Sequence, residues 1–146
     1  VGRGVVQDVE KAIGLVAKSA HKDVSSGQVV LGLAYYKGFG VPANEYRAVY
    51  WLIKAALQDN IQAQLELGTI YREMTPPPLD KSFEYFSMAA GQGNAAAMRW
   101  QWFMYLNGFG VKRNIDQGLE SLQLATYSGD IHAYYQLGSL YILRVL

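Results

Sequence analysis

One pattern recurs four times along this chain of 146 residues. It centres on a tyrosine, with a small residue eight positions earlier and, in three of the four copies, a Leu-Gly pair that begins four positions earlier. The four tyrosines, spaced by 36, 34 and 36 residues, are Tyr35, Tyr71, Tyr105 and Tyr141. An internal period of this length is typical of arrays in which one supersecondary unit stacks on the next. The repeat therefore limits the possible folds more strongly than any other feature.

The repeating unit is predicted to consist of two helices. A second set of residues, with offsets of three, four and seven positions, follows three of the tyrosines, and one further set precedes the first; such offsets place residues on one helix face. We call the helix that bears the tyrosine a first-type helix and the other a second-type helix. First-type helices are predicted at about 27–37, 61–73, 95–107 and 131–144. Second-type helices are predicted at about 8–20, 45–57, 80–90 and 115–127.

These helices predict an all-α fold, a right-handed α-solenoid superhelix of antiparallel helix pairs. The predicted solenoid is a single unit over residues 1–146, with a second-type helix at 8–20, repeats at about 27–57, 61–90 and 95–127, and a first-type helix at 131–144. The chain begins at Val1 rather than methionine, and its last helix has no second-type partner. We therefore expect it to be a fragment of a longer repeat array.

Glycines occupy two kinds of position in the repeat. Within first-type helices a glycine costs about 1 kcal/mol relative to alanine, so we expect neighbouring helices to approach closely at Gly32, Gly68 and Gly138. In the loops, "VGRGVVQD" at 1–8, "KGFGVPAN" at 37–44 and "NGFGVKRN" at 107–114 are three copies of one glycine loop. Gly38 and Gly108 are predicted to end a helix at positive φ, whereas a phosphate-binding loop would need a preceding strand.

The residue that starts each second-type helix is also predicted from the loops. Asn44 and Asn114 occupy the N-cap position, and Asp8 has the equivalent position in the first copy. The second loop differs, since "REMTPPPLD" replaces the glycines and places Pro78 at the expected cap. We therefore expect Asp80 to cap that helix.

Composition and charge exclude several function classes. The chain has 13 Lys and Arg against 12 Asp and Glu, a net charge of +1, without the basic excess of a nucleic-acid surface. It has no cysteine and only His21 and His132 as histidines, so neither a zinc site nor a thiol nucleophile is expected. We predict no enzymatic activity, no cofactor and no metal. No apolar run reaches the ~20 residues of a membrane span, so a soluble chain is expected, with the bacterial cytoplasm and periplasm as alternatives.

The repeated string resembles the Sel-one-like repeat (SLR) family, a branch of the tetratricopeptide-like α-solenoids. The residues that carry the resemblance include "AQLELGTIY" and "AVYWLIKAALQDNIQA", and it covers the whole chain. The resemblance implies a scaffold or adaptor for protein–protein interaction rather than an enzyme. A cysteine-rich bacterial subgroup has been linked to β-lactam binding, but this chain has no cysteine. A small-molecule-binding or hydrolytic member of the repeat family is the alternative.

The partner is expected to bind first-type helices, because these line the concave surface of stacked helix pairs. The residues predicted to bind it are Tyr36, Arg72, Arg99, Phe103, His132 and Tyr135. The repeated tyrosines and Trp51 are expected in the core. Leu33, Phe103 and Tyr135 could equally fill the interior of a tightly wound solenoid. Self-association through exposed repeat ends is also expected as a possibility, since the last helix carries apolar residues such as Leu137 and Leu140.

Overall fold

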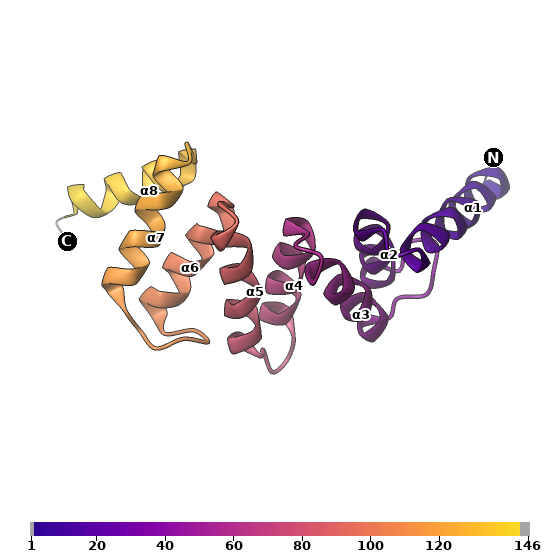
Figure 1. The fold of residues 1–146 in the computed structure, drawn as a ribbon, viewed down its shortest axis with the longest axis horizontal. Coiled ribbons are helices and arrows are strands. Elements are labelled where there is room, and N and C mark those ends of the chain that lie inside the picture. The colour runs from indigo at the N-terminus through magenta and orange to yellow at the C-terminus, as the bar shows by residue number, and fades with distance from the viewer. Residues whose placement is uncertain (1, 144–146) are drawn as a thin grey trace. The chain divides into compact units, whose positions relative to one another are not determined.

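The computed structural model describes residues 2–143, with side chains from residue 8 onward, and over these residues it holds eight helices and no strand (Figure 1). The helices are α1 (Gly2–His21), α2 (Ser25–Lys37), α3 (Glu45–Ala56), α4 (Ile61–Glu73), α5 (Leu79–Gly91), α6 (Ala95–Asn107), α7 (Ile115–Tyr127) and α8 (Ile131–Ile142). First-type helices are α2, α4, α6 and α8. The all-α solenoid of helical repeats predicted from the sequence is confirmed, whereas its right-handed sense stays a prediction. The last residue of the helix expected at 131–144 lies outside the described residues.

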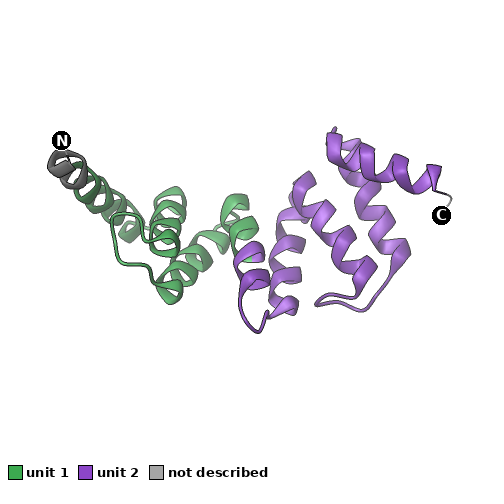
Figure 2. Cartoon of the chain, turned by 180° about the vertical axis from the view of Figure 1, so that it is seen from behind, with its two compact units in different colours: residues 1–67 green, residues 68–146 purple. Residues whose placement is uncertain are grey.

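The chain divides into two compact units, Val1–Leu67 and Gly68–Leu146 (Figure 2). In the first unit, α2 packs between α1 and α3, and a core cluster joins Ala20, Leu31 and Trp51, with Tyr35 packed against it. In the second, α6 packs between α5 and α7. The expectation of a single solenoid unit over the whole chain stays a prediction.

The first glycine loop and its cap are predicted wrongly. Helix α1 begins at Gly2 and runs to His21, so the two glycines at 2 and 4 and Asp8 all lie within a helix. The other two glycine loops, by contrast, follow α2 and α6 and end those helices. Residues 2–8 form the first turns of α1 instead of turning the chain.

The other two glycine loops agree with the prediction. Gly38 and Gly108 are the C-caps of α2 and α6, with φ of 68° and 70°, and their N–H groups donate to carbonyls of the preceding turn. The Asn44 side chain accepts from the Arg47 N–H at 2.9 Å, and Asn114 accepts from Gln117 N–H at 3.1 Å. Each loop thus closes one helix and starts the next.

The cap expected at Asp80 is wrong, because α5 already begins at Leu79, with Pro78 as its N-cap. The Pro78 carbonyl accepts the first helical hydrogen bond from Ser82 at 3.1 Å. Proline has φ fixed near the helical value, so it fits at a helix start even though it offers no side-chain acceptor. Asp80 lies in the first turn of α5, where its negative charge interacts favourably with the positive end of the helix dipole.

Close helix approach is confirmed at two of the three helix glycines. A Cβ at Gly32 would lie 2.8 Å from Leu52 of α3, and one at Gly68 would lie 2.7 Å from Phe86 of α5. In the third repeat the large residue lies on the first-type helix and the glycine lies on the second-type helix. Trp102 of α6 stands where the other repeats have glycine, and the facing residue of α7 is Gly118, whose Cβ would meet the indole at 2.8 Å.

Helix α8 departs from the expected packing. A Cβ added at Gly138 would have no neighbour within 4 Å, and Tyr141, expected in the core, is 59% exposed. Both positions face a second-type helix in the earlier repeats, and none follows α8 among the described residues. The apolar residues on this surface of α8 are Ile131, Tyr134, Tyr141 and Ile142.

Candidate functional site

A cavity of about 400 Å³ in the second unit is lined only by first-type helices. Arg72 comes from α4, Gln136 comes from α8, and α6 between them contributes three residues, Arg99, Trp100 and Phe103. The lining combines two guanidinium groups, one amide and two aromatic rings. It therefore offers charge, hydrogen bonds and apolar surface together, as ligand and peptide sites usually do.

Aromatic stacking fixes one wall of this cavity. Phe86 of α5 is fully buried, and its ring stacks on Trp100 with centroids 5.4 Å apart. The guanidinium carbon of Arg72 lies 4.2 Å from the centroid of the same indole, a cation–π contact. Phe103 meets Trp100 edge-on at 5.9 Å. The buried core of the repeat thus continues, through Trp100, to the arginine at the surface.

Arg99 is held by the start of the next first-type helix. Its Nε lies 3.1 Å from Oδ1 of Asp130, whose side chain is only 15% exposed. The same oxygen accepts from the Ala133 N–H at 2.8 Å and so caps α8. One carboxylate therefore starts α8 and orients the arginine that lines the cavity.

The cavity brings together three of the six residues predicted to bind a partner. Arg72, Arg99 and Phe103 line it. Tyr135 is 76% exposed and His132 is also exposed, but neither lines the cavity, although both belong to α8 like Gln136. Tyr36 is half-buried in the first unit, so its place in a groove shared with the others stays a prediction.

Two lining residues, Trp100 and Gln136, are missing from the set predicted from the sequence. Each stands five positions before a repeated tyrosine, Tyr105 and Tyr141. They therefore share one position in the repeat and one helix face. Extending the predicted stripe to this position would have found both.

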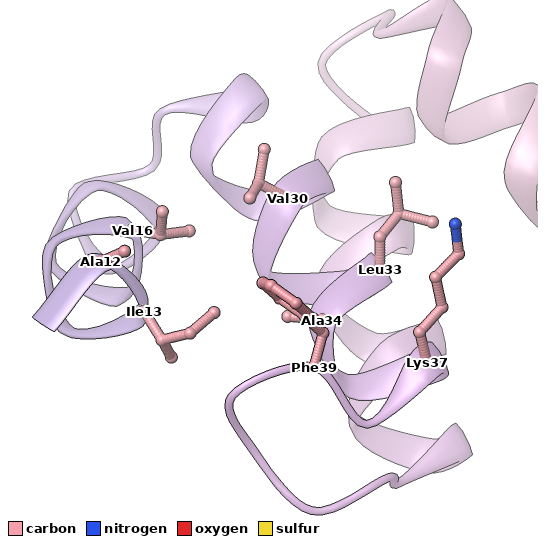
Figure 3. Close-up of a pocket in the computed structure, with 8 residues that line it drawn as sticks. All are labelled: Ala12, Ile13, Val16, Val30, Leu33, Ala34, Lys37 and Phe39. Atoms are coloured by element: carbon pink, nitrogen blue, oxygen red, sulfur yellow. The ribbon is translucent and has the colours of Figure 1, made fainter. Parts of the chain in front are cut away.

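The first unit has a smaller cavity, of about 280 Å³, between α1 and α2 (Figure 3). Its lining is Ala12, Ile13, Val16, Val30, Leu33, Ala34, Lys37 and Phe39. In Figure 3 the α1 residues face Val30 and Phe39 across the gap. Lys37 alone carries a polar side chain, so this groove provides apolar contact without the mixed chemistry of the larger cavity.

Other features of the described residues indicate structural roles. Tyr71 and Tyr85 stack at 5.7 Å, and burial, with the negative charge of Glu84 nearby, raises the pKa of both hydroxyls above the usual range. They are neutral phenols at neutral pH. His21 packs edge-on against Trp51.

Among the side chains described, no group of three or more His, Asp or Glu could hold a metal ion. Over the same part of the chain, no helix is both long and apolar enough to cross a membrane.

Comparison with protein families identifies the repeat. The family model of the Sel1 repeat matches residues 1–24, 25–60, 61–94 and 101–130, which together are most of the chain. The chain belongs to the Sel1 repeat family. This is the Sel-one-like family that the sequence resembles, and its members generally mediate protein–protein interaction. Sel1 scaffold proteins are generally non-enzymatic.

Solved structures of Sel1 repeat proteins share the fold. The chain is similar to c5321, a protective antigen of uropathogenic Escherichia coli strains with an SLR fold (31% identity, TM-score 0.83, 91% of this chain and 29% of that one). It also resembles a Sel1 repeat protein from Oxalobacter formigenes (26% identity, TM-score 0.82, 92% and 56%). Cysteine-rich protein B of Helicobacter pylori is 23% identical, with a TM-score of 0.68 over 91% of this chain and 97% of that one. At this identity the similarity supports a shared fold only. The chain thus spans about a third and about half of the lengths of the first two.

Proposed function

We propose that this Sel1 repeat protein is a non-enzymatic adaptor that binds a peptide or protein segment on the first-type helices of its second unit. The observation that carries the proposal is the cavity between α4, α6 and α8, because its lining comes from first-type helices alone. Arginine and aromatic side chains dominate the binding energy of protein interfaces. Four of the five lining residues are of these kinds.

The surroundings of the cavity support a peptide as the ligand. Phe103 is 40% exposed and Tyr135 is 76% exposed, so both rings are accessible to a partner. Trp100 is already fixed by stacking on Phe86, so little side-chain entropy is lost when it becomes covered. An extended segment that crosses the mouth of the cavity could contact Tyr135 and His132 as well as the lining residues. These two residues are therefore proposed to bind outside the cavity.

Phe103→Ala is expected to weaken peptide binding about tenfold, the equivalent of ~1–2 kcal/mol for an interface anchor. Peptides would be selected from a displayed random library on the immobilised protein, and their affinities measured by fluorescence anisotropy. The melting temperature should change little, because the Phe103 side chain is partly exposed.

Tyr127→Ala is the matched control for this measurement. Tyr127 is a 91% exposed aromatic residue at the end of α7, a second-type helix. We expect its removal to leave peptide affinity unchanged. Equal loss of affinity in both variants, or none in Phe103→Ala, would place the binding surface elsewhere.

Self-association through the exposed repeat ends is a separate proposal, supported by the apolar residues on α8, and is tested by the molar mass in solution.

A further inference from the structure

Three residues that line the cavity of the second unit each carry a buried side-chain atom without a hydrogen-bond partner. Three buried side-chain atoms, Nε of Arg72, Nε of Arg99 and Oε1 of Gln136, make no hydrogen bond. All three residues line the cavity. For Arg99 the ion pair and this finding are compatible, because the Asp130 oxygen is near Nε but outside the direction of its N–H. Buried polar atoms without partners are unfavourable and call for a physical reason.

We propose that the cavity binds the C-terminal residue of a partner peptide, with its carboxylate between Arg72 and Arg99. This inference rests on the proposed function and names the chemistry of the bound segment. A guanidinium group has five N–H donors in a planar fork that matches the two oxygens of a carboxylate. The carboxylate would satisfy both unpaired Nε donors, and the N–H of the same peptide residue would donate to Oε1 of Gln136. A chain end offers these two groups side by side.

The existing ion pairs leave room for an added carboxylate. The Arg72 guanidinium lies 3.6 Å from the Glu73 carboxylate, and the two side chains are 34% and 52% exposed. A long, exposed contact of this kind contributes little stability, so a ligand carboxylate can replace it at low cost. Asp130 is more buried and stays with Arg99 as the cap of α8. Arg72 is therefore the principal ligand of the carboxylate, and Arg99 is the second.

The remaining lining selects the side chain of the bound residue. The rings of Trp100 and Phe103 meet edge-on and form an apolar corner beside the arginines. At about 400 Å³, the cavity is at the small end of the ~300–1,000 Å³ range of ligand pockets. It is too small for a helix, whose diameter with side chains is ~10–12 Å. A C-terminal residue with an apolar or aromatic side chain matches this space.

The test uses two peptide libraries with the same random sequences, one ending in a free carboxylate and the other in an amide. Peptides that bind the wild-type chain are selected from each, and each selected sequence is then measured in both forms by fluorescence anisotropy. We expect the free acids to end in apolar residues and to bind at least tenfold more tightly than their amides. Arg72→Met, which keeps a side chain over the Trp100 ring but removes the charge, should abolish that preference.

Arg47→Met is the matched control, because Arg47 of α3 also lies over an aromatic ring, with its guanidinium carbon 5.4 Å from the Tyr35 centroid. It should leave the preference for the free acid unchanged. If Arg72→Met does not fold, as judged by circular dichroism, the comparison of acid with amide on the wild-type chain decides alone.

Other outcomes overturn the inference. If acids and amides bind with equal affinity and Phe103→Ala abolishes this binding, the carboxylate site is contradicted, whereas the proposed function is still supported. A third outcome is that amidated peptides bind as tightly as the acids, but only when they contain Asp or Glu. The site would then bind an acidic side chain instead of a terminal carboxylate. If no peptide from either library binds in a manner that depends on Phe103, both proposals fail.

Discussion

Gly110→Ala is expected to lower the free energy of unfolding by about 3 kcal/mol or more, a large part of the stability of a small domain. Gly110 has φ of 67°, and a Cβ there would overlap the backbone carbonyl of Leu79 at the start of α5. A backbone obstacle cannot rotate away as a side chain can, so the loop or the start of α5 must shift. The measurement is urea denaturation followed by far-UV circular dichroism.

Gly108→Ala provides the matched control two residues away. Gly108 has nearly the same φ, 70°, but its nearest neighbour, Cβ of Arg113, is 3.5 Å from an added Cβ, an ordinary contact. The cost should therefore be that of the left-handed conformation alone, about 1 kcal/mol. Similar losses in the two variants would show that contact with Leu79 does not limit this loop.

These two glycines show which structural features the repeat pattern predicts and which it does not. The position of Gly108 after a helix predicts its positive φ, because only the local chain is involved. The role of Gly110 depends on Leu79, which lies 31 residues earlier in the sequence, and no local pattern gives that contact. The copy at the start of the chain has a similar glycine spacing but forms helix. Glycine spacing alone therefore does not predict a turn.

The candidate site was predictable to a similar extent. A stripe on the first-type helices includes Arg72, Arg99 and Phe103, since helical periodicity places these residues away from the repeated core face. The stripe leaves out the repeat position shared by Trp100 and Gln136, which both line the cavity. It also includes Tyr135, which is exposed and does not line the cavity.

Buried polar residues were the least predictable part of the fold. Gln28 and Gln64 stand 36 positions apart and are fully buried. Their amides donate to the carbonyls of Ala20 and Ala56, at 3.3 and 3.2 Å, where each second-type helix ends. Glutamine is ordinarily exposed, so its recurrence at the repeat period was the available signal.

Phe86→Ala is expected to cost about 3–5 kcal/mol, as is typical when a buried phenylalanine is truncated. The Phe86 ring is fully buried, covers Gly68 of α4 and stacks on Trp100 of the cavity wall. Its loss leaves a void in the core and removes the support of the indole. Peptide binding should therefore weaken together with stability, unlike in Phe103→Ala, where binding alone is affected.

A second substitution tests the contact between Phe86 and Gly68 directly. Gly68→Ala in the wild-type chain would place a Cβ 2.7–2.8 Å from three atoms of the Phe86 ring, and overpacking of this kind costs about 1–3 kcal/mol. In the Phe86→Ala background the same methyl group enters the void, and alanine is favoured over glycine within a helix by about 1 kcal/mol. The effect of Gly68→Ala should therefore change from destabilising to stabilising. Gly138→Ala, with no neighbour within 4 Å, should have the same effect in both backgrounds. If Gly68→Ala destabilised both backgrounds equally, the ring would not be the obstacle at this helix crossing, and its role in supporting Trp100 would also be in doubt.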